Sequence, residues 1–559
     1  MENIIIVDPF STGVNFFEDI LQRGFHPVAI WTKRSEMLFE VMEEVRAPIE
    51  HRYKSVADFY VECETYEKTL AMVRDLKPKF ILPGADLGIE LSTHLADDLG
   101  LPGNPYERIP QYTNKFLMHQ TLIDHGVRGI RGKIVHNLDE TLEYYRSQGF
   151  TGCVLKPYRG ASSVDVRICD SEEELKAAYE EVFASGNYMG GEEEGMLLQE
   201  CIVGTEYIVN TVSYAGKHKL SAMWKHSKKK VEGGGMVYNY TETLSRPETG
   251  STALVNYAFA VLNALGVEYG NVHSEFMIDK NGPVLIEVNC RPMGSNMSAE
   301  FLDQIWGHHE TDLCLDAYLH PEAFLAHVND PFRPLAKGLK KHLITAKEQE
   351  VISSPALTLI RRQKSFCKAS LGKAVGERLA RTVDLDTAAG IVYLVNKDEA
   401  QLYRDRNFLE RAEEMAFPML FSEKRKDASE KPETLATVEE VMDALKPVGS
   451  VLLLSNETDS LPGVTVVDAD QVTKLQGGYQ TGILDLAFKE NEDYEEMAEA
   501  FYALADQVRE DGLLVVPERT YWHFSSGMES FEILCEAVGF LIEAPNVDTG
   551  KVFLARKRG

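Results

Sequence analysis

The feature that most constrains this chain is a pair of alternating segments, at residues 272–278 and 283–289, which flank the turn-forming sequence Asp-Lys-Asn-Gly at 279–282. Alternation on both sides of such a turn predicts a β-hairpin. Side chains of one parity lie on one face of a strand pair. One face is therefore expected to gather two carboxylates, an amide and a guanidinium: Glu275, Glu287, Asn289 and Arg291.

This set of side chains favours binding of a cation and a phosphate. Oxygen ligands from two carboxylates and an amide suit Mg²⁺, which completes its coordination shell with water and substrate phosphates. An arginine at position 291 is placed to neutralise charge on a phosphoryl group during transfer. The alternative is a sheet face of solvated charges, and the hairpin alone leaves both interpretations open.

The composition indicates a large multidomain protein and excludes some partners. A chain of 559 residues exceeds what one hydrophobic core usually serves. Its 58 Lys and Arg against 87 Asp and Glu give a net charge of −29, which argues against a nucleic-acid partner. The chain has no apolar run that predicts a membrane span, no secretory signal at its N-terminus and no CxxC pair among its 8 cysteines. We therefore expect a cytoplasmic protein.

Residues 1–110 are expected to form an α/β domain around a parallel sheet. Predicted strands and helices alternate there: strands near 3–7, 27–31 and 80–83, and helices near 14–23, 66–76 and 87–99. This alternation is typical of a parallel sheet covered on both faces, and such sheets hold ligands at the carboxyl ends of their strands. Because no GxGxxG follows the first strand, a dinucleotide is not favoured.

The remainder of the chain is expected to form three further α/β regions. Residues 111–335 are a mixed α+β region that contains the hairpin, and 336–425 follow with a strand at 390–395 and a helix at 399–416. The polar, charge-rich segment at 422–431 predicts a linker. Residues 432–559 then predict a Rossmann-like α/β unit.

Three segments supply what a nucleotide needs around the hairpin. Lys156 ends a predicted strand and precedes a loop of small residues, whose backbone N–H groups can approach phosphate oxygens. The segment at 197–210 predicts two strands joined by a bend, which offers backbone groups to an adenine ring and places Glu206 near ribose hydroxyls. Lys115 opens a predicted helix. The alternatives are an ordinary turn, polar residues at a sheet edge and a solvated lysine.

In this order, the segments resemble the ATP-grasp superfamily over residues 1 to about 420. The loop after Lys156 resembles that of D-alanine–D-alanine ligases, and Asn289-Cys-Arg291 resembles L-amino-acid ligases and biotin carboxylases. The sequence at 386–393 resembles the C-terminal extension of L-amino-acid ligases. The resemblance implies a set of ATP-binding residues: Lys115, Lys156, Gly160, Ser162, Ser163, Gln199, Glu200, Cys201, Ile202 and Glu206.

The resemblance also implies a reaction. ATP phosphorylates a carboxylate, and an amine attacks the resulting acyl phosphate to form an amide, by positioning and charge neutralisation. Lys156 and Arg291 would act in phosphoryl transfer, and the other hairpin polar residues, Glu275, Glu287 and Asn289, would hold two Mg²⁺ ions, with Mn²⁺ as a substitute. We expect amino acids or a similar small acid and amine as substrates, and a homodimer.

Residues near the acyl substrate are expected just beyond the hairpin. Gly294 and Ser295 would leave room for the substrate or offer it backbone N–H groups. His273 lies two residues before Glu275 and would orient a substrate carboxylate, unless it is a satisfied histidine of the sheet. The basic and glycine-rich segment at 224–235 predicts either a mobile loop that closes over phosphates or a solvated loop.

The C-terminal unit is not explained by a ligase. Its second half resembles the closing strands of class I methyltransferases, but Leu454-Ser-Asn-Glu457 stands where a glycine-rich loop should follow the first strand. We therefore expect a docking or dimerisation module. Two other functions stay open for the chain, a biotin-carboxylase-like ATP-dependent carboxylase and a non-enzymatic ATP-binding scaffold.

Overall fold

The computed structural model divides the chain into two compact units, Met1–Ser227 with Thr241–Lys337 (unit 1) and Lys228–Tyr240 with Gly338–Gly559 (unit 2). The residues that the structure describes are 1–37, 39–158, 166–184, 195–231, 236–244, 251–345, 349–350, 360–371, 378–384, 387–414, 438–445, 447, 449–455, 460–467, 471, 475, 477–485, 494–517, 540–542 and 552–557. No helix among them has the length and apolar composition needed to cross a membrane.

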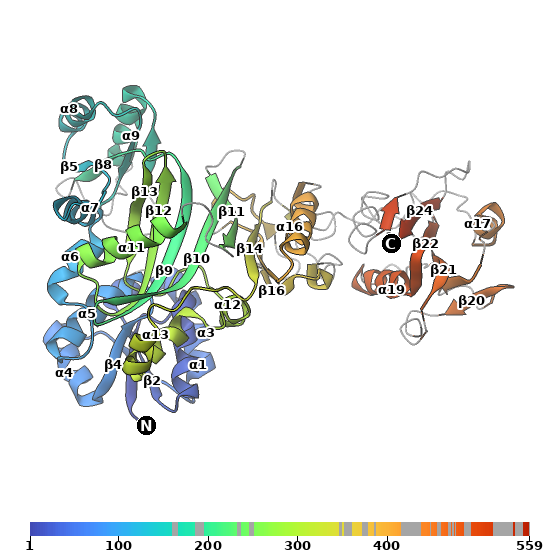
Figure 1. Cartoon of the computed structure of the whole chain (residues 1–559), viewed down its shortest axis with the longest axis horizontal. Helices are drawn as coiled ribbons and strands as arrows, with labels where there is room; N and C mark the ends of the chain where they lie inside the picture. Colours follow the sequence, from blue (N-terminus) through green and yellow to red (C-terminus); the bar gives the residue numbers. More distant parts are fainter. Residues whose placement is uncertain are drawn as a thin grey trace. The chain divides into compact units, whose positions relative to one another are not determined.

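The first sheet of unit 1 is parallel, as its alternating pattern predicted. Its strands are β1 (Asn3–Val7), β2 (His26–Trp31), β3 (Asp58–Val61) and β4 (Pro78–Pro83), in the order β3-β2-β1-β4. Its helices are α1 (Asn15–Gln22), α2 (Lys33–Met37), α3 (Phe39–Tyr53), α4 (Tyr66–Leu76) and α5 (Ile89–Asp98). Figure 1 shows this sheet and its helices in blue. Apolar side chains from both faces of β1 are fully buried, which explains its continuous apolar run.

Two loops at the carboxyl ends of β1 and β4 are packed backbone against backbone. A Cβ atom added to Gly13 would lie 2.3 Å from the Gly84 carbonyl oxygen, and one added to Gly84 would lie 2.6 Å from the Asp8 carbonyl oxygen. A Cβ atom on Gly88 would lie 2.4 Å from the carbonyl oxygen of Val7. Only glycine permits this approach. The loops are therefore held together at the edge of the sheet where ligands usually bind.

A second sheet in unit 1 is small, and two helices pack on one of its faces. Its strands, in the order β5-β8-β6-β7, are β5 (Gly132–Val135), β8 (Met196–Glu200), β6 (Cys153–Lys156) and β7 (Arg167–Cys169). Leu155 and Leu198 belong to a core that includes residues of α8 (Leu138–Gln148) and α9 (Glu172–Ala184). Lys156 and Gln199 have the opposite parity, so they lie on the other face.

The predicted hairpin is confirmed. β12 (Gly270–Asp279) and β13 (Gly282–Asn289) pair antiparallel, and a bulge lies between Glu275 and Phe276. β12 also pairs antiparallel with β9 (Thr205–Tyr214), which pairs with β10 (Lys217–Lys230). Phe276 and Val288 lie in a core with α11 (Ser251–Leu265), so this helix covers one face of the hairpin. The turn is fixed by Arg128, which donates from both Nη atoms to Asp279 at 2.9 and 2.7 Å.

Helices on both sides of the hairpin in the sequence complete unit 1. They are α6 (Ile109–Thr113), α7 (Lys115–Asp124), α12 (Ala299–Trp306), α13 (Glu310–Leu319) and α14 (Pro321–Ala326). Lys115 therefore opens a helix, as predicted. The side chain of Asn114 caps that helix by accepting hydrogen bonds from the N–H groups of Phe116 and Leu117.

Part of the predicted loop at 224–235 is a strand instead. Residues 224–230 belong to β10, whose Lys225 pairs with Tyr207 of β9, and the glycines at 233–235 lie outside the described residues. Backbone pairing with neighbouring strands therefore outweighs the polar composition of this run. The next strand is β11 (Met236–Thr243), and the Lys228 ammonium lies 4.7 Å from the centre of the Tyr238 ring.

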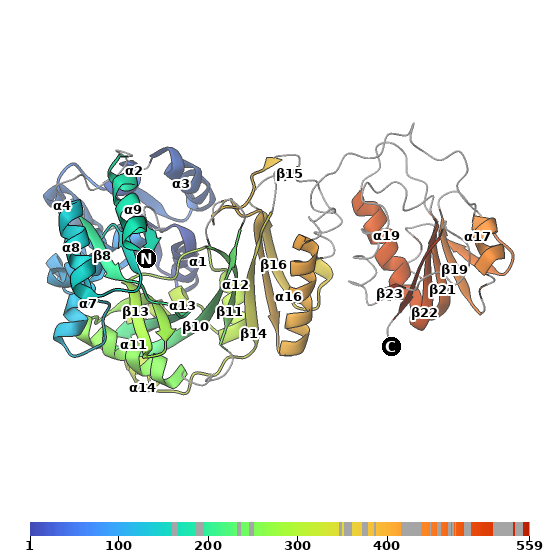
Figure 2. The same cartoon turned by 90° about the horizontal axis from the view of Figure 1, so that it is seen from above.

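The first part of unit 2 after β11 contains two groups of described strands. β14 (Lys337–Leu343), β18 (Gly390–Asn396) and β16 (Phe366–Leu371) are neighbours in one sheet, and α16 (Glu399–Glu414) packs along β18 (Figure 2). β15 (Gln349–Glu350) and β17 (Arg378–Leu379) form a separate pair. The strand at 390–395 and the helix at 399–416 were predicted at nearly these positions.

The C-terminal sheet has the order β20-β19-β21-β22-β24-β23. Its strands are β19 (Val451–Ser455), β20 (Val464–Val467), β21 (Tyr479–Asp485), β22 (Val508–Pro517), β23 (Phe540–Ile542) and β24 (Val552–Lys557). The first four are parallel, whereas β24 runs antiparallel to both β22 and β23. Described helices of this region are α17 (Val438–Leu445) and α19 (Tyr494–Gln507). The predicted linker at 422–431 lies outside the described residues.

Candidate functional site

The hairpin brings its polar residues together on the face opposite the core. In the register of β12 and β13, Glu275 lies opposite Glu287 and His273 lies opposite Asn289. The Asn289 Nδ2 donates to Glu287 Oε1 at 2.8 Å, which leaves its amide oxygen for another partner. Two carboxylates and one amide oxygen therefore share a small area, as the sequence predicted, and this donor set fits Mg²⁺.

His273 orients one of these carboxylates. Its Nε2 lies 3.2 Å from Glu275 Oε1, and its Nδ1 lies 2.9 Å from Asn210 Oδ1. Burial opposes ionisation of Glu275, but the hydrogen bond to His273 and the nearby cations outweigh it, so the pKa of Glu275 lies well below its ordinary value. The carboxylate is thus ionised and ready for a cation. The structure places His273 inside the sheet, 4 % exposed, with both ring nitrogens close to side-chain oxygens, as in a satisfied histidine of the sheet.

Two lysines face the carboxylates from other elements. Lys115 Nζ lies 3.0 Å from Glu287 Oε2, so this ammonium sits beside the candidate metal ligand. Lys156 is 8 % exposed. Burial and the neighbouring charge of Lys115 lower the pKa of Lys156 to about 8, against the opposing effect of Glu287 and Glu275. The two lysines and the two glutamates therefore influence one another electrostatically. The two ammonium groups repel each other, and an anion bound near both would relieve that repulsion.

The candidate adenine-binding segment has an unsatisfied polar group. Gln199 is 2 % exposed, and its Nε2 has no hydrogen-bond partner among the described residues. Such a buried donor is costly unless a ligand or water satisfies it. Glu200 instead forms an ion pair with Arg131 at 3.1 Å, and the Cys201 N–H donates to the Gly152 carbonyl at 3.0 Å. Ile202 follows in the bend between β8 and β9, beyond the end of the small sheet.

Glu206 lies on the same face as the metal-ligand candidates. It pairs with Met277 in the register of β9 and β12, two positions from the pair formed by Ile208 and Glu275. Its Oε1 lies 3.8 Å from His226 Nε2. The other predicted phosphate-binding residues, Gly160, Ser162 and Ser163, lie outside the described residues. Within the described part of the chain, no group of three or more His, Cys, Asp and Glu side chains could hold a metal ion, so a cation here depends on the Asn289 amide and on phosphates.

Arg291 is held by a residue that the sequence did not single out. Its Nε donates to Asp86 Oδ1 at 2.8 Å, and its Nη1 donates to the Pro292 carbonyl at 2.8 Å. Asp86 begins a short 3₁₀ turn, Asp86–Gly88, directly after β4. The sequence did contain one clue to Asp86, which is its position. An acidic residue just beyond the carboxyl end of a parallel strand lies where such sheets bind ligands.

The segment after Arg291 is held by the first loop of the chain. The Asn296 N–H donates to Ser11 Oγ at 3.1 Å, and the Met297 N–H donates to Thr12 Oγ1 at 2.9 Å. Ser11, Ser295 and Asn296 have φ angles of 55°, 66° and 50°, in the left-handed region that non-glycine residues seldom adopt. Such strain gathers at functional sites. Gly294 lies beside the guanidinium, since an added Cβ would be 4.0 Å from Arg291 Nη1.

A buried carboxylate joins the hairpin to this segment. Glu310, at the start of α13 and 3 % exposed, accepts a hydrogen bond from the Met293 N–H at 2.7 Å through Oε2. Its Oε1 accepts one from Asn210 Nδ2. Asn210 is in turn bonded to His273. A continuous chain of hydrogen bonds therefore runs from the carboxylate of Glu275 to the backbone beyond Arg291.

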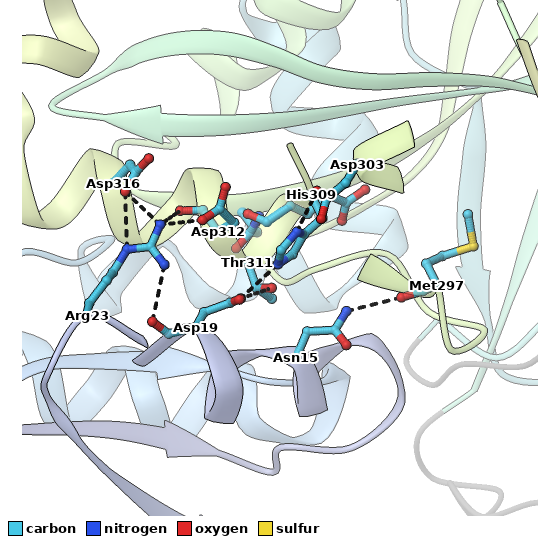
Figure 3. Close-up of polar contacts among 11 residues, drawn as sticks. Asn15, Asp19, Arg23, Met297, Asp303, His309, Thr311, Asp312 and Asp316 are labelled. Carbon is cyan, nitrogen blue, oxygen red and sulfur yellow. Dashed lines mark hydrogen bonds and ion pairs between the residues drawn. The ribbon is translucent and has the colours of Figure 1, made fainter. Parts of the chain in front are cut away.

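A polar cluster between α1 and α13 fixes the first domain against these elements. Figure 3 shows His309 between Asp19 and Asp303, at 2.9 and 2.8 Å, and Arg23 pointing to two aspartates of α13, Asp312 and Asp316. In the same view, Asn15 Nδ2 donates to the Met297 carbonyl at 3.1 Å. The helix α1 and its C-cap Arg23 are thus tied both to the helix α13 and to the segment after Arg291.

Known proteins resemble this arrangement. Residues 150–300 match the family model described as an ATP-grasp domain. Dapdiamide A synthase of Enterobacter agglomerans is 24% identical over 408 residues, which cover 72% of this chain and 93% of that protein. A D-alanine–D-alanine ligase of Lacticaseibacillus casei is 26% identical over 195 residues, 32% of this chain and 48% of that protein.

Solved structures agree with these sequence matches. An L-amino acid ligase from Bacillus licheniformis has a TM-score of 0.57 at 17% identity, covering 74% of this chain and 97% of that one. Phosphoribosylglycinamide synthetase from Anaerococcus prevotii has a TM-score of 0.54 at 15% identity, covering 73% and 98%. About a quarter of this chain therefore has no counterpart in either structure. The likeness in architecture and the matched domain show that this chain has the ATP-grasp fold.

Proposed function

We propose that this protein is an ATP-dependent carboxylate–amine ligase that forms an amide bond between small molecules, with amino acids or similar acids and amines as substrates. The observation that carries the proposal is one shared face on which Glu275, Glu287 and Asn289 lie, with the ammonium group of Lys115 3.0 Å from Glu287. The relatives named as dapdiamide A synthase, D-alanine–D-alanine ligase and L-amino acid ligase support this class of reaction.

The chain's own residues supply binding and charge. Lys115 and Lys156 hold ATP phosphates, while Gln199 and the bend after it bind adenine, with Glu206 at the ribose. Glu275, Glu287 and Asn289 would hold Mg²⁺, two ions in our proposal and replaceable by Mn²⁺, and the cation would neutralise charge on the phosphates. The orphaned Gln199 donor and the oxygen-rich hairpin face fit these groups.

The reaction then needs no nucleophilic side chain. The substrate carboxylate attacks the γ-phosphorus of ATP, which breaks the bond to ADP and gives an acyl phosphate. Arg291 stabilises the phosphoryl group in transfer and afterwards the acyl phosphate. The amine attacks the acyl carbon, phosphate leaves, and the nitrogen loses a proton. Gly294 and Ser295 border the acyl substrate, since Gly294 lies against the Arg291 guanidinium.

The proposal extends to the rest of the chain. Residues 432–559 act as a docking or dimerisation module of a homodimer, and the strand β24, antiparallel to both β22 and β23, supports the resemblance of this region to a class I methyltransferase half. We propose four domains, at residues 1–110, 111–335, 336–425 and 432–559. A reducing cytoplasm suits the seven cysteines of the described residues, all of which are free thiols.

The test is turnover with defined substrates. The protein is incubated with ATP, Mg²⁺ and pairs of amino acids, and ADP, phosphate and new amide products are measured, the products by mass spectrometry. Glu287→Gln should remove turnover and leave the fold intact, because it removes one carboxylate ligand. Glu322→Gln, the same change at an exposed position of α14, is the control. Release of ADP that depends on bicarbonate and not on an amine would favour the carboxylase, and normal ADP formation by Glu287→Gln would refute the assignment.

A further inference from the structure

We propose that Asp86 of the first domain is a positioning residue for Arg291, which holds its guanidinium ready for the phosphoryl group and away from the metal-binding carboxylates. The inference rests on the proposed role of Arg291 in phosphoryl transfer. It assigns to the first domain a part in the chemistry of the site, through a contact between residues 205 positions apart.

The hydrogen bonds of Arg291 leave one edge of its guanidinium for a ligand. Nε donates to Asp86 at 2.8 Å, and Nη1 donates to the Pro292 carbonyl at 2.8 Å. A guanidinium has five N–H donors in a rigid plane, so two fixed contacts, at Nε and Nη1, set the direction of the remaining donors. Arg291 is 8 % exposed, which prevents solvent from replacing either contact freely.

Charge balance gives Asp86 a second effect. The carboxylates that act electrostatically on Arg291 include Asp86, Glu287 and Glu275, with Asp86 contributing most, and the buried Glu310 of α13. Without Asp86, the strongest remaining attraction on the guanidinium comes from the two carboxylates of the hairpin. Arg291 would then move toward the oxygens that Mg²⁺ needs and would compete with the cation for them.

The backbone around Asp86 explains why it can position another group. Asp86 begins the 3₁₀ turn Asp86–Gly88, and a Cβ atom would not fit at Gly84, which contacts the loop after β1, or at Gly88, which contacts Val7 of β1. The turn therefore has little room to move. A carboxylate on a rigid turn can fix a partner to within the fraction of an ångström that phosphoryl transfer requires.

The test compares Asp86→Asn with Asp97→Asn, which makes the same change at an exposed position of α5. In Asp86→Asn, kcat is expected to fall about 100-fold, with the KM for ATP changed less than about threefold, because misplacement of a catalytic group acts mainly in the transition state. The Mg²⁺ concentration needed for half-maximal ADP binding, measured by titration calorimetry, should rise about tenfold. Asp97→Asn should match the wild type in both measurements.

A third variant, Asp86→Glu, keeps the charge and is expected to retain the wild-type Mg²⁺ requirement for ADP binding while kcat falls less than in Asp86→Asn. Wild-type kcat and Mg²⁺ requirement in Asp86→Asn would overturn the inference. An equal loss of ADP binding and of the urea unfolding midpoint in Asp86→Asn and Asp86→Glu would also overturn it, since it would show a structural role. Absence of ligase turnover in the wild type would refute the proposed function instead, and the calorimetric comparison would still report on Asp86.

Discussion

Two buried lysines, one in each unit, differ in what surrounds them. Lys341, in β14 of unit 2, is fully buried, donates to Glu413 Oε1 and to the His342 carbonyl, and so has a carboxylate of its own. Lys156, in unit 1, is nearly as buried but has no hydrogen bond or ion pair among the described residues, and Lys115 lies near enough to repel it. Burial lowers the pKa of both.

The difference separates a structural charge from a functional one. A buried cation with its own carboxylate is neutralised within the fold, and the loss of either partner leaves the other uncompensated. A buried cation without a carboxylate partner destabilises the folded state, and a bound anion can offset this destabilisation. Lys341 should therefore matter for stability and Lys156 for nucleotide binding.

The largest expected effect is that of replacing Lys156. Lys156→Gln should lower kcat/KM for ATP by about 10²–10³-fold, because it removes a charge-assisted contact to phosphate in a poorly solvated site. The free energy of unfolding should stay the same or rise, since a buried charge is removed. Steady-state kinetics and urea unfolding measure the two effects. A variant that unfolds much more easily while keeping its ATP kinetics would make Lys156 a structural residue and break the comparison.

The converse is expected in unit 2. Glu413→Gln should lower the free energy of unfolding by about 3 kcal/mol, because Lys341 then remains buried without a carboxylate. Turnover of ATP should stay within about twofold of the wild type when assayed at low temperature. The double variant Lys341→Met with Glu413→Leu serves as the control and should recover most of the stability, since neither charge remains. Equal losses in the double and single variants would argue against the pair as the cause.

The pH dependence of ATP binding is a third test. Burial, aided by repulsion from Lys115, lowers the pKa of Lys156 to about 8, so the group is charged below pH 8 and progressively neutral above it. Because bound phosphates favour the charged form, the KM for ATP should rise about tenfold per pH unit above pH 8. Lys156→Arg keeps its charge throughout and should flatten this rise. The same slope in Lys156→Arg and in the wild type would assign the titration to another group.

The smallest expected effect concerns His309, a third buried cation with carboxylate partners. Burial opposes its protonation, but Asp19 and Asp303 outweigh this and raise its pKa from 6.5 to about 10. Its folded pKa lies above the unfolded one, so its stabilisation is complete below pH 6.5 and is lost as pH rises toward 10. His309→Gln should therefore reduce the free energy of unfolding by about 1–2 kcal/mol at pH 6 and by less at pH 9.5. Urea unfolding at the two pH values gives the difference.

Local patterns in the sequence were enough for much of the fold. The alternation and turn residues at 272–289 predicted the hairpin, and because side-chain direction follows from strand period, they also placed Glu275 and Glu287 on one face. The helix that begins at Lys115 and the parallel strands of the first sheet were likewise visible locally. These features depend on neighbours in sequence, which is why a single sequence was sufficient.

Contacts between distant segments were beyond such reasoning. Asp86 meets Arg291, and Asn210 meets Glu310, through the packing of separate elements, and no spacing in the sequence encodes either pair. The prediction of a loop was wrong at the basic residues 225–230 for a related reason. Its charges suggested a loop, but the strand is decided by backbone pairing with β9, which composition does not reveal.

The contacts of Gly13, Gly84 and Gly88 limit how this site could be redesigned. Any side chain at these positions would collide with backbone atoms rather than with movable groups. A mutant library aimed at new substrates should therefore leave them unchanged and vary Ser295, which we propose to border the acyl substrate. Its left-handed φ of 66° is best tolerated by Gly, Asn and Asp, so few residue types are suitable at this position. New specificity should therefore be easier to obtain by replacing side chains than by changing the path of the backbone.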